Sequence, residues 1–252
     1  MYACTARLFA ALTLAGAGFG FAGPALALEH STLGDFLFGA PKSAAPAVAR
    51  YEVGASSFVL DTAPGKQAFL KFEDNPEIWV LRATSGPRGD VIYKNDMDEP
   101  MVRATRLGGI TLFTPTQPDG MPAAFIGQGS TLHSPRDMEP EELFNIFVQA
   151  SARVSHMAQH LVVFEGAQDI TAASAPVFAD AAILTSQAFT RVGGKGKEGR
   201  MLVARFVKVE FNAGKDAAAS ARGQVVQITV CPDRGVAGRP SSERIASVIS
   251  RK

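Results

Sequence analysis

The sequence predicts an α+β protein, with an antiparallel β-meander or a small sandwich or barrel in its N-terminal half and mixed α/β structure in its C-terminal half. In residues 51–135, short β-type runs are separated by turn residues at roughly ten-residue spacing. After residue 136, apolar residues recur at intervals of three or four, which is typical of helices. The hydrophobic fraction of 46% and the charged fraction of 19% are ordinary for globular proteins, and exclude disorder, collagen and coiled coil.

The first 27 residues are expected to be a secretory signal peptide. They contain one cation, Arg7, followed by an uncharged apolar run over residues 8–23 and the small-residue triplet 25–27. This run is shorter than the roughly 20 residues that span a bilayer, and no later stretch is long and apolar enough. Cleavage before Leu28 would give a periplasmic or secreted chain without a stable membrane span.

The mature chain is expected to begin with a flexible arm or linker over residues 28–50, followed by the β-rich domain at 51–135. The arm is predicted because its second half is rich in Ala and Pro and has no periodicity. A turn is expected at 118–120, where the sequence is Pro-Asp-Gly, and no useful helix fits among the Gly and Pro residues of the β-rich domain. The expected strands are 57–61, 68–73, 77–82, 90–94, 101–106, 110–113 and 123–126.

The C-terminal domain, 136–252, is expected to mix helices and strands. A helix should begin at Pro140, where acidic neighbours oppose the positive end of the helix dipole. The glycine- and lysine-rich segment 193–199 is expected to be a mobile basic loop. The remaining expected elements are a short strand or helix end at 161–164, a helix at 174–191, strands at 202–211 and 224–230, and a closing helix at 242–249.

The cysteine count is consistent with export. Loss of Cys4 with the leader would leave Cys231 alone, so that no internal disulfide could form. Cys231 follows an apolar run and is expected to be buried, which would protect a thiol in an oxidising compartment.

Charge is distributed unevenly along the chain. Residues 191–252 carry 13 basic and 5 acidic residues, whereas residues 28–190 carry 11 basic and 19 acidic residues. This asymmetry indicates either a surface for anions or attraction between the two halves of the chain. Nucleic acid is not expected as a partner, because the basic part has few aromatic residues and the chain is expected to be exported.

No catalytic or metal template is satisfied, and no cofactor is expected. His156 and His160 have the spacing of a zinc pair, but they fall on the polar side of the expected helix and lack the glutamate base of a zinc protease. Residues 95–99 supply oxygen ligands without the glycine and distal glutamate of a calcium loop. Ser130 lacks the flanking pattern of a nucleophile elbow.

The segment 231–244 is the strongest candidate for ligand binding. It joins an expected strand to an expected helix, whose free N–H groups would attract an anion, while arginine side chains would add fork-shaped donors. The alternative is that the same residues only shape a strand-to-helix loop. The candidate anion-binding residues are Arg234, Gly235, Gly238, Arg239, Ser241 and Ser242.

Three stretches, 87–96, 103–113 and 238–245, resemble those of an uncharacterised family of exported bacterial proteins that is classed as a domain of unknown function. The resemblance implies a bacterial envelope setting and a single unit formed by the two halves. It brings no activity, cofactor or catalytic residue.

These observations favour an exported non-catalytic binding or accessory protein whose partner is an unknown envelope ligand or protein. One alternative is a periplasmic hydrolase acting on an anionic envelope substrate, with the loop 234–242 holding the anion. The other alternative is an inhibitor that presents the β-hairpin tips at 87–90 or 95–99.

Overall fold

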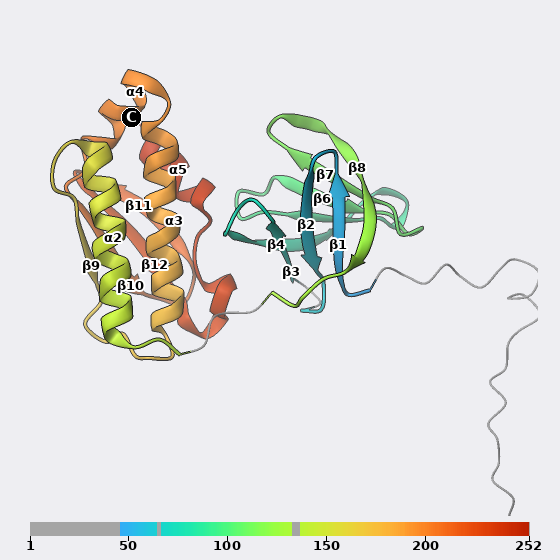
Figure 1. Ribbon diagram of the computed structural model, residues 1–252, viewed down its shortest axis with the longest axis horizontal. Helices are drawn as coiled ribbons and strands as arrows, with labels where there is room; N and C mark the ends of the chain where they lie inside the picture. The colour runs from blue at the N-terminus through green and yellow to red at the C-terminus, as the bar shows by residue number, and fades with distance from the viewer. Residues whose placement is uncertain (1–45, 65–66, 133–136, 252) are drawn as a thin grey trace, which may run out of the picture. The chain divides into compact units, whose positions relative to one another are not determined.

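The computed structural model describes residues 46–64, 67–132 and 137–251 and confirms the α+β fold class (Figure 1). A closed antiparallel barrel is followed by a four-stranded mixed sheet with helices. Both belong to one compact unit, Ser43–Lys252. Among the described residues, no helix has the length and apolar character needed to cross a membrane. The expected signal peptide, 1–27, lies outside the described residues.

Each barrel strand pairs antiparallel with the next, and the last pairs with the first to close the barrel. The first strand begins at Val48, so the end of the expected arm 28–50 belongs to the barrel. The alternation of this strand was not recognised in the sequence, because an Ala- and Pro-rich stretch comes directly before it. The strands are β1 (Val48–Val53), β2 (Ser56–Asp61), β3 (Gln67–Phe72), β4 (Ile78–Ser85), β5 (Val91–Lys94), β6 (Pro100–Ala104), β7 (Ile110–Thr114) and β8 (Gln117–Gln128).

Alternate side chains of the strands fill the barrel interior. In β1, Ala49, Tyr51 and Val53 are buried, whereas Arg50 and Glu52 are exposed. An eight-stranded barrel is just wide enough for its own side chains to fill it. The interior is therefore a packed core, formed by Ala49, Tyr51, Val53, Phe58, Leu60, Ala68, Leu70, Trp79, Leu81, Tyr93, Val102, Ile110 and Leu112.

The expected turn at 118–120 is wrong. The chain reverses at residues 115–116, and β8 continues through 118–120. Gly120 has φ +83°, and a Cβ there would lie 2.6 Å from a ring atom of Phe113. This glycine therefore allows β8 to pass close to side chains of β7 and does not make a turn.

The C-terminal sheet has the strand order β11-β12-β10-β9. Strand β10 is parallel to both β9 and β12, and β11 is antiparallel to β12. The strands are β9 (Val163–Gly166), β10 (Lys208–Ala213), β11 (Ala218–Arg222) and β12 (Val225–Val230), and the helices are α2 (Pro140–Ala158), α3 (Ala175–Gly193), α4 (Gly196–Val203) and α5 (Ser242–Ser250).

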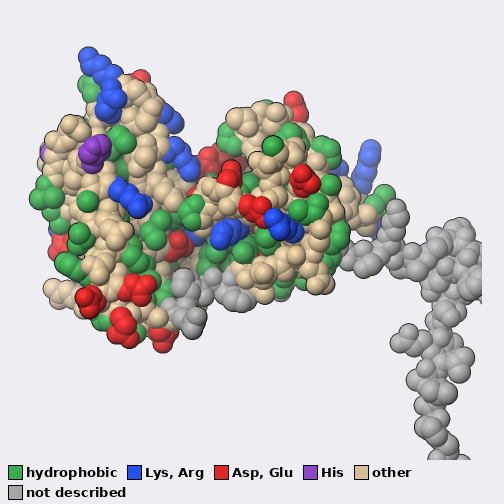
Figure 2. All heavy atoms as spheres, in the orientation of Figure 1, with side chains coloured by type: hydrophobic (Ala, Val, Ile, Leu, Met, Phe, Trp, Pro, Cys, Tyr) green, Lys and Arg blue, Asp and Glu red, His purple; other side chains and the backbone are tan. Residues whose placement is uncertain are grey.

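Helices cover one face of this sheet. Alternate residues of β10 and β12 are buried in one core with α2, α3 and α5. The other face carries polar residues together with Val163 and Val225, and Lys208 pairs there with Glu210 at 2.9 Å. Figure 2 shows acidic side chains gathered where α2 begins and basic side chains gathered over α4.

Two expectations for the C-terminal half are wrong. Residues 193–199, expected as a mobile loop, end α3 and begin α4. The strand expected at 202–211 begins only at Lys208, because residues 202–203 belong to α4. A Cβ on Gly199 would lie 2.0 Å from the carbonyl oxygen of Val192, so glycine lets α4 pack directly against the end of α3.

Candidate anion-binding site

Glycines shape the segment that was expected to bind an anion. A 3-10 stretch, Pro232–Gly238, precedes α5. Gly235 has φ 52° and ψ −130°, which glycine adopts readily and other residues do not. A Cβ on Gly238 would lie 1.9 Å from the carbonyl oxygen of Cys231. Both glycines therefore have a structural role and bring Arg239 to the start of α5.

The start of α5 binds two carboxylates that the barrel supplies. The Ser241 hydroxyl caps the helix by accepting a hydrogen bond from the Arg244 N–H. The N–H and hydroxyl of Ser241 donate to Asp96 at 3.0 and 2.6 Å. The N–H and hydroxyl of Ser242 donate to Glu77 at 2.9 and 2.6 Å. The N–H groups expected to attract an external anion thus bind the protein's own anions.

Glu77 is buried at this junction, with an exposed fraction of 1%. Burial raises the pKa of its carboxyl, and this effect exceeds the lowering by Ser242, Arg239 and Arg191. The Arg191 guanidinium donates to the Ser242 hydroxyl at 3.0 Å. Glu77 therefore links the barrel to α3 and α5.

The two arginines of the candidate segment lie in different environments. The Arg239 side chain is 1% exposed; its Nε donates to Asp180 on α3 and its Nη2 donates to the Ile78 carbonyl at 2.8 Å. Arg234 is 53% exposed and pairs with Asp216 at 3.0 Å. The structure therefore brings Arg239 to the junction with the barrel, but leaves Arg234 outside it.

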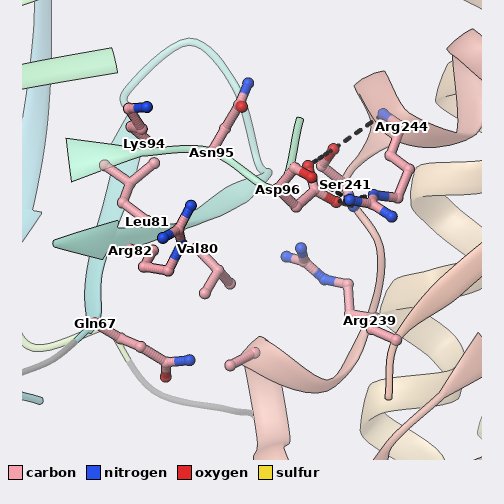
Figure 3. Close-up of a pocket in the computed structure, with 12 residues that line it drawn as sticks. Gln67, Val80, Leu81, Arg82, Lys94, Asn95, Asp96, Arg239, Ser241 and Arg244 are labelled. Atoms are coloured by element: carbon pink, nitrogen blue, oxygen red, sulfur yellow. Dashed lines mark hydrogen bonds and ion pairs between the residues drawn. The ribbon is translucent and has the colours of Figure 1, made fainter. Parts of the chain in front are cut away.

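A cavity of about 220 Å³ lies between the barrel and the segment before α5 (Figure 3). Figure 3 shows Arg82 and Arg239 on opposite walls, with their guanidinium groups facing the space between them. Gln67, from β3, adds an amide. The lining residues are Gln67, Val80, Leu81, Arg82, Lys94, Asn95, Asp96, Ala217, Ala237, Arg239, Ser241 and Arg244.

The cations of this cavity differ in how firmly they are held. Arg239 is fixed inside the protein by its buried contacts. Arg82 and Lys94 share one carboxylate, that of Asp98, at 2.5 and 3.4 Å. The Asp98 side chain is 64% exposed, and water screens such pairs strongly. A bound anion can therefore compete with Asp98 for both cations.

The sequence did not indicate that barrel residues belong to this site. Arg82 is an exposed residue within β4 and Lys94 ends β5, and charged residues are ordinary at both positions. Glu77 and Asp96 had no local signal for a distant partner. The charge asymmetry was the available clue, because attraction between the two halves was one of its interpretations, and both carboxylates bind α5.

A comparison with protein families classifies the whole folded region. A family described as a domain of unknown function, DUF4908, matches residues 33–249. The chain belongs to the DUF4908 family. This confirms the expected uncharacterised family, and the DUF4908 match includes part of the expected arm as well as the barrel and the C-terminal sheet. No curated protein and no solved structure matches the chain.

The other motifs are also placed by the structure. His160 Nε2 lies 2.9 Å from the carbonyl oxygen of Phe206, and neither it nor His156 lines the cavity. In the part of the chain that the structure describes, no group of three or more His, Cys, Asp and Glu residues could hold a metal ion. Cys231 is a buried free thiol, as expected.

The two hairpin tips proposed for an inhibitor differ in exposure. The tip 95–99 contacts α5, because the Asn95 amide lies 3.4 Å from the Glu243 carboxylate. In the tip 87–90, Asp90 is 7% exposed and pairs with Arg103 at 2.5 Å, so only residues 87–89 are exposed.

Proposed function

We propose that this protein is an exported, non-catalytic binding protein whose ligand is a small anion held in the cavity between the barrel and α5. Its partner is then an anionic ligand of the cell envelope. Support for export comes from the leader at 1–27 and from the burial of Cys231, the lone cysteine of a cleaved chain. Support for binding comes from the cavity and its cations.

The observation that carries the proposal is the arrangement of Arg82 and Lys94. Both line the cavity, and Asp98 is their shared ion-pair partner within the described residues. A ligand carboxylate or phosphate would balance the remaining positive charge, and Arg82 can bind either group through two parallel hydrogen bonds. The buried Arg239 adds fixed positive charge on the opposite wall.

Hydrolysis remains the second candidate, and the lining residues support it less well. A hydrolase needs a free base or nucleophile near the bound anion. The carboxylate that lines the cavity, that of Asp96, accepts two hydrogen bonds from Ser241 and lies 3.1 Å from Arg244 Nε. These contacts hold Asp96 in a structural role. The inhibitor alternative is weakened by the tip 95–99, which packs on α5.

Anion binding is tested by isothermal titration of the purified protein with succinate and with inorganic phosphate, with glycerol as the uncharged control. We expect the double variant R82A/K94A to bind the preferred anion at least about tenfold more weakly, since both cations that a ligand can recruit are removed. Arg50→Ala is the matched control, because Arg50 is a half-exposed barrel arginine that pairs with Glu73 outside the cavity. Absence of binding by the unaltered protein, or equal binding by R82A/K94A, would reject the proposal.

Export is tested separately. We expect mass spectrometry of the protein isolated from the envelope fraction to find Leu28 at its N-terminus. Full-length protein that begins at Met1 and is free in the cytosol would reject export while leaving the binding site open to test.

A further inference from the structure

An apolar groove lies where α2 begins, apart from the cavity described above. Its volume is about 230 Å³; α2 forms one wall and the stretch from β9 to α3 forms the other. Phe144 is 66% exposed, and Val148, one turn later on the same face, is 49% exposed. Single exposed apolar residues are ordinary, but two of them beside an apolar groove form a continuous surface of the kind that binds a partner.

Acidic side chains surround this groove. Five exposed carboxylates lie on its two walls or next to them, and none has an ion-pair partner within the described residues. They belong to Asp137, Glu139, Glu141, Glu142 and Asp169. Figure 2 shows the acidic side chains gathered at this end. The groove therefore favours an occupant that is both apolar and basic.

The opposite end of α3 carries the complementary surface. Lys197, Arg200 and Met201 are exposed on α4. Their spacing of three and four residues places them on one face of the helix. Met201 is 66% exposed, and basic side chains gather over α4 in Figure 2. One end of the C-terminal layer is thus apolar and acidic, and the other is apolar and basic.

These two surfaces cannot meet within one molecule. Ala175, the first residue of α3, lines the groove, and α3 ends at Gly193, just before α4. A helix of 19 residues is about 28 Å long. Because α3 is one continuous and largely buried helix, it holds the groove and α4 apart by about this length.

We propose that copies of this chain associate head to tail, with α4 of one copy in the groove of the next. Met201 packs beside Phe144, since thioethers make favourable contacts with aromatic rings, and Lys197 and Arg200 face the acidic rim. Each contact uses two different surfaces and leaves one groove and one α4 free, so the assembly can grow. Screening of the charges weakens it as salt rises.

Sedimentation velocity over a range of protein and salt concentrations tests this proposal. We expect the mass of the unaltered protein to rise with concentration and to fall with salt. The groove variant E141Q/F144Q and the helix variant R200Q/M201Q should each remain monomeric. The matched control R106Q/L107Q removes an exposed Arg-Leu pair from the β6–β7 turn, where Leu107 is 95% exposed, and should associate like the unaltered protein.

A mixture of the groove variant and the helix variant tests whether the contact between copies is the one between α4 and the groove. The groove variant keeps α4 and the helix variant keeps the groove, so the mixture should form a one-to-one dimer that neither variant forms alone. The proposal would be overturned if the unaltered protein remains monomeric at all concentrations. That result is expected if the groove binds another protein instead. Self-association that persists in either variant alone would also overturn it, because the contact would then lie elsewhere. Circular dichroism of each variant serves as the control that the substitutions leave the protein folded.

Discussion

The Ser242 hydroxyl donates a 2.6 Å hydrogen bond to the Glu77 carboxylate, although these residues are 165 positions apart in the chain. The Ser242 N–H donates to the other carboxylate oxygen at 2.9 Å. Both residues are almost completely buried. Carboxylates are rarely buried unless they are paired, so this contact fixes how the start of α5 meets the barrel.

The raised pKa of Glu77 predicts a pH dependence of stability. Because folding raises this pKa, the folded state binds the proton more tightly, and this favours folding most below the unfolded-state pKa. The contribution is lost as pH rises through the folded-state pKa, which lies above the ordinary value of 4.5. We expect Glu77→Gln, which cannot titrate, to show a smaller loss of unfolding free energy than the unaltered protein between about pH 4 and pH 8. Urea unfolding at each pH measures the free energy of unfolding of Glu77→Gln and of the unaltered protein. If the two free energies change in parallel with pH, Glu77 is not the group responsible.

Arg239→Ala is expected to lower the stability of the protein, and not only its ligand binding. The substitution removes a buried guanidinium and leaves the Asp180 carboxylate and the Ile78 carbonyl without that donor. We expect a loss of about 3 kcal/mol in the free energy of unfolding. The control is Arg234→Ala at an exposed pair, for which a change within about 0.5 kcal/mol is expected. Similar urea midpoints for the two variants would show that Arg239 is not a structural link.

The fold could be predicted where the signals are local. Short β-type runs between turn residues identified β2 to β7, and three-four spacing of apolar residues identified α2. The helices expected at 174–191 and 242–249 correspond to α3 and α5. Helix α4 could not be predicted, because its glycines and lysines are typical of a loop and its packing depends on Gly199. The site follows the same rule. The segment around Arg239 has a recognisable loop-to-helix pattern, whereas Asp96 gains its role from Ser241, 145 positions away.

Trp79 should tolerate replacement by phenylalanine. Its side chain is buried in the barrel, and its Nε1–H has no hydrogen-bond partner within the described residues. Trp79→Phe removes this unsatisfied donor while keeping most of the ring, so we expect a change within about 1 kcal/mol in the free energy of unfolding. Leu81→Ala, in the same strand, removes packing at a fully buried position and should cost about 2 to 5 kcal/mol. A larger loss for Trp79→Phe than for Leu81→Ala would indicate that the indole N–H has a partner after all.

Gly199→Ala tests whether α4 owes its position to close packing. Helix propensity alone favours alanine over glycine by about 1 kcal/mol. The structure predicts that the substitution instead lowers the stability. The new Cβ would lie 2.0 Å from the Val192 carbonyl oxygen, and α4 would have to move away from α3. We expect a loss of about 2 kcal/mol in urea unfolding. Gly194→Ala is the matched control: Gly194 already has helical angles, φ −67° and ψ −14°, and its nearest neighbour would be 3.1 Å from the added Cβ. If Gly199→Ala stabilises the protein as much as helix propensity predicts, α4 does not pack against the end of α3 in solution.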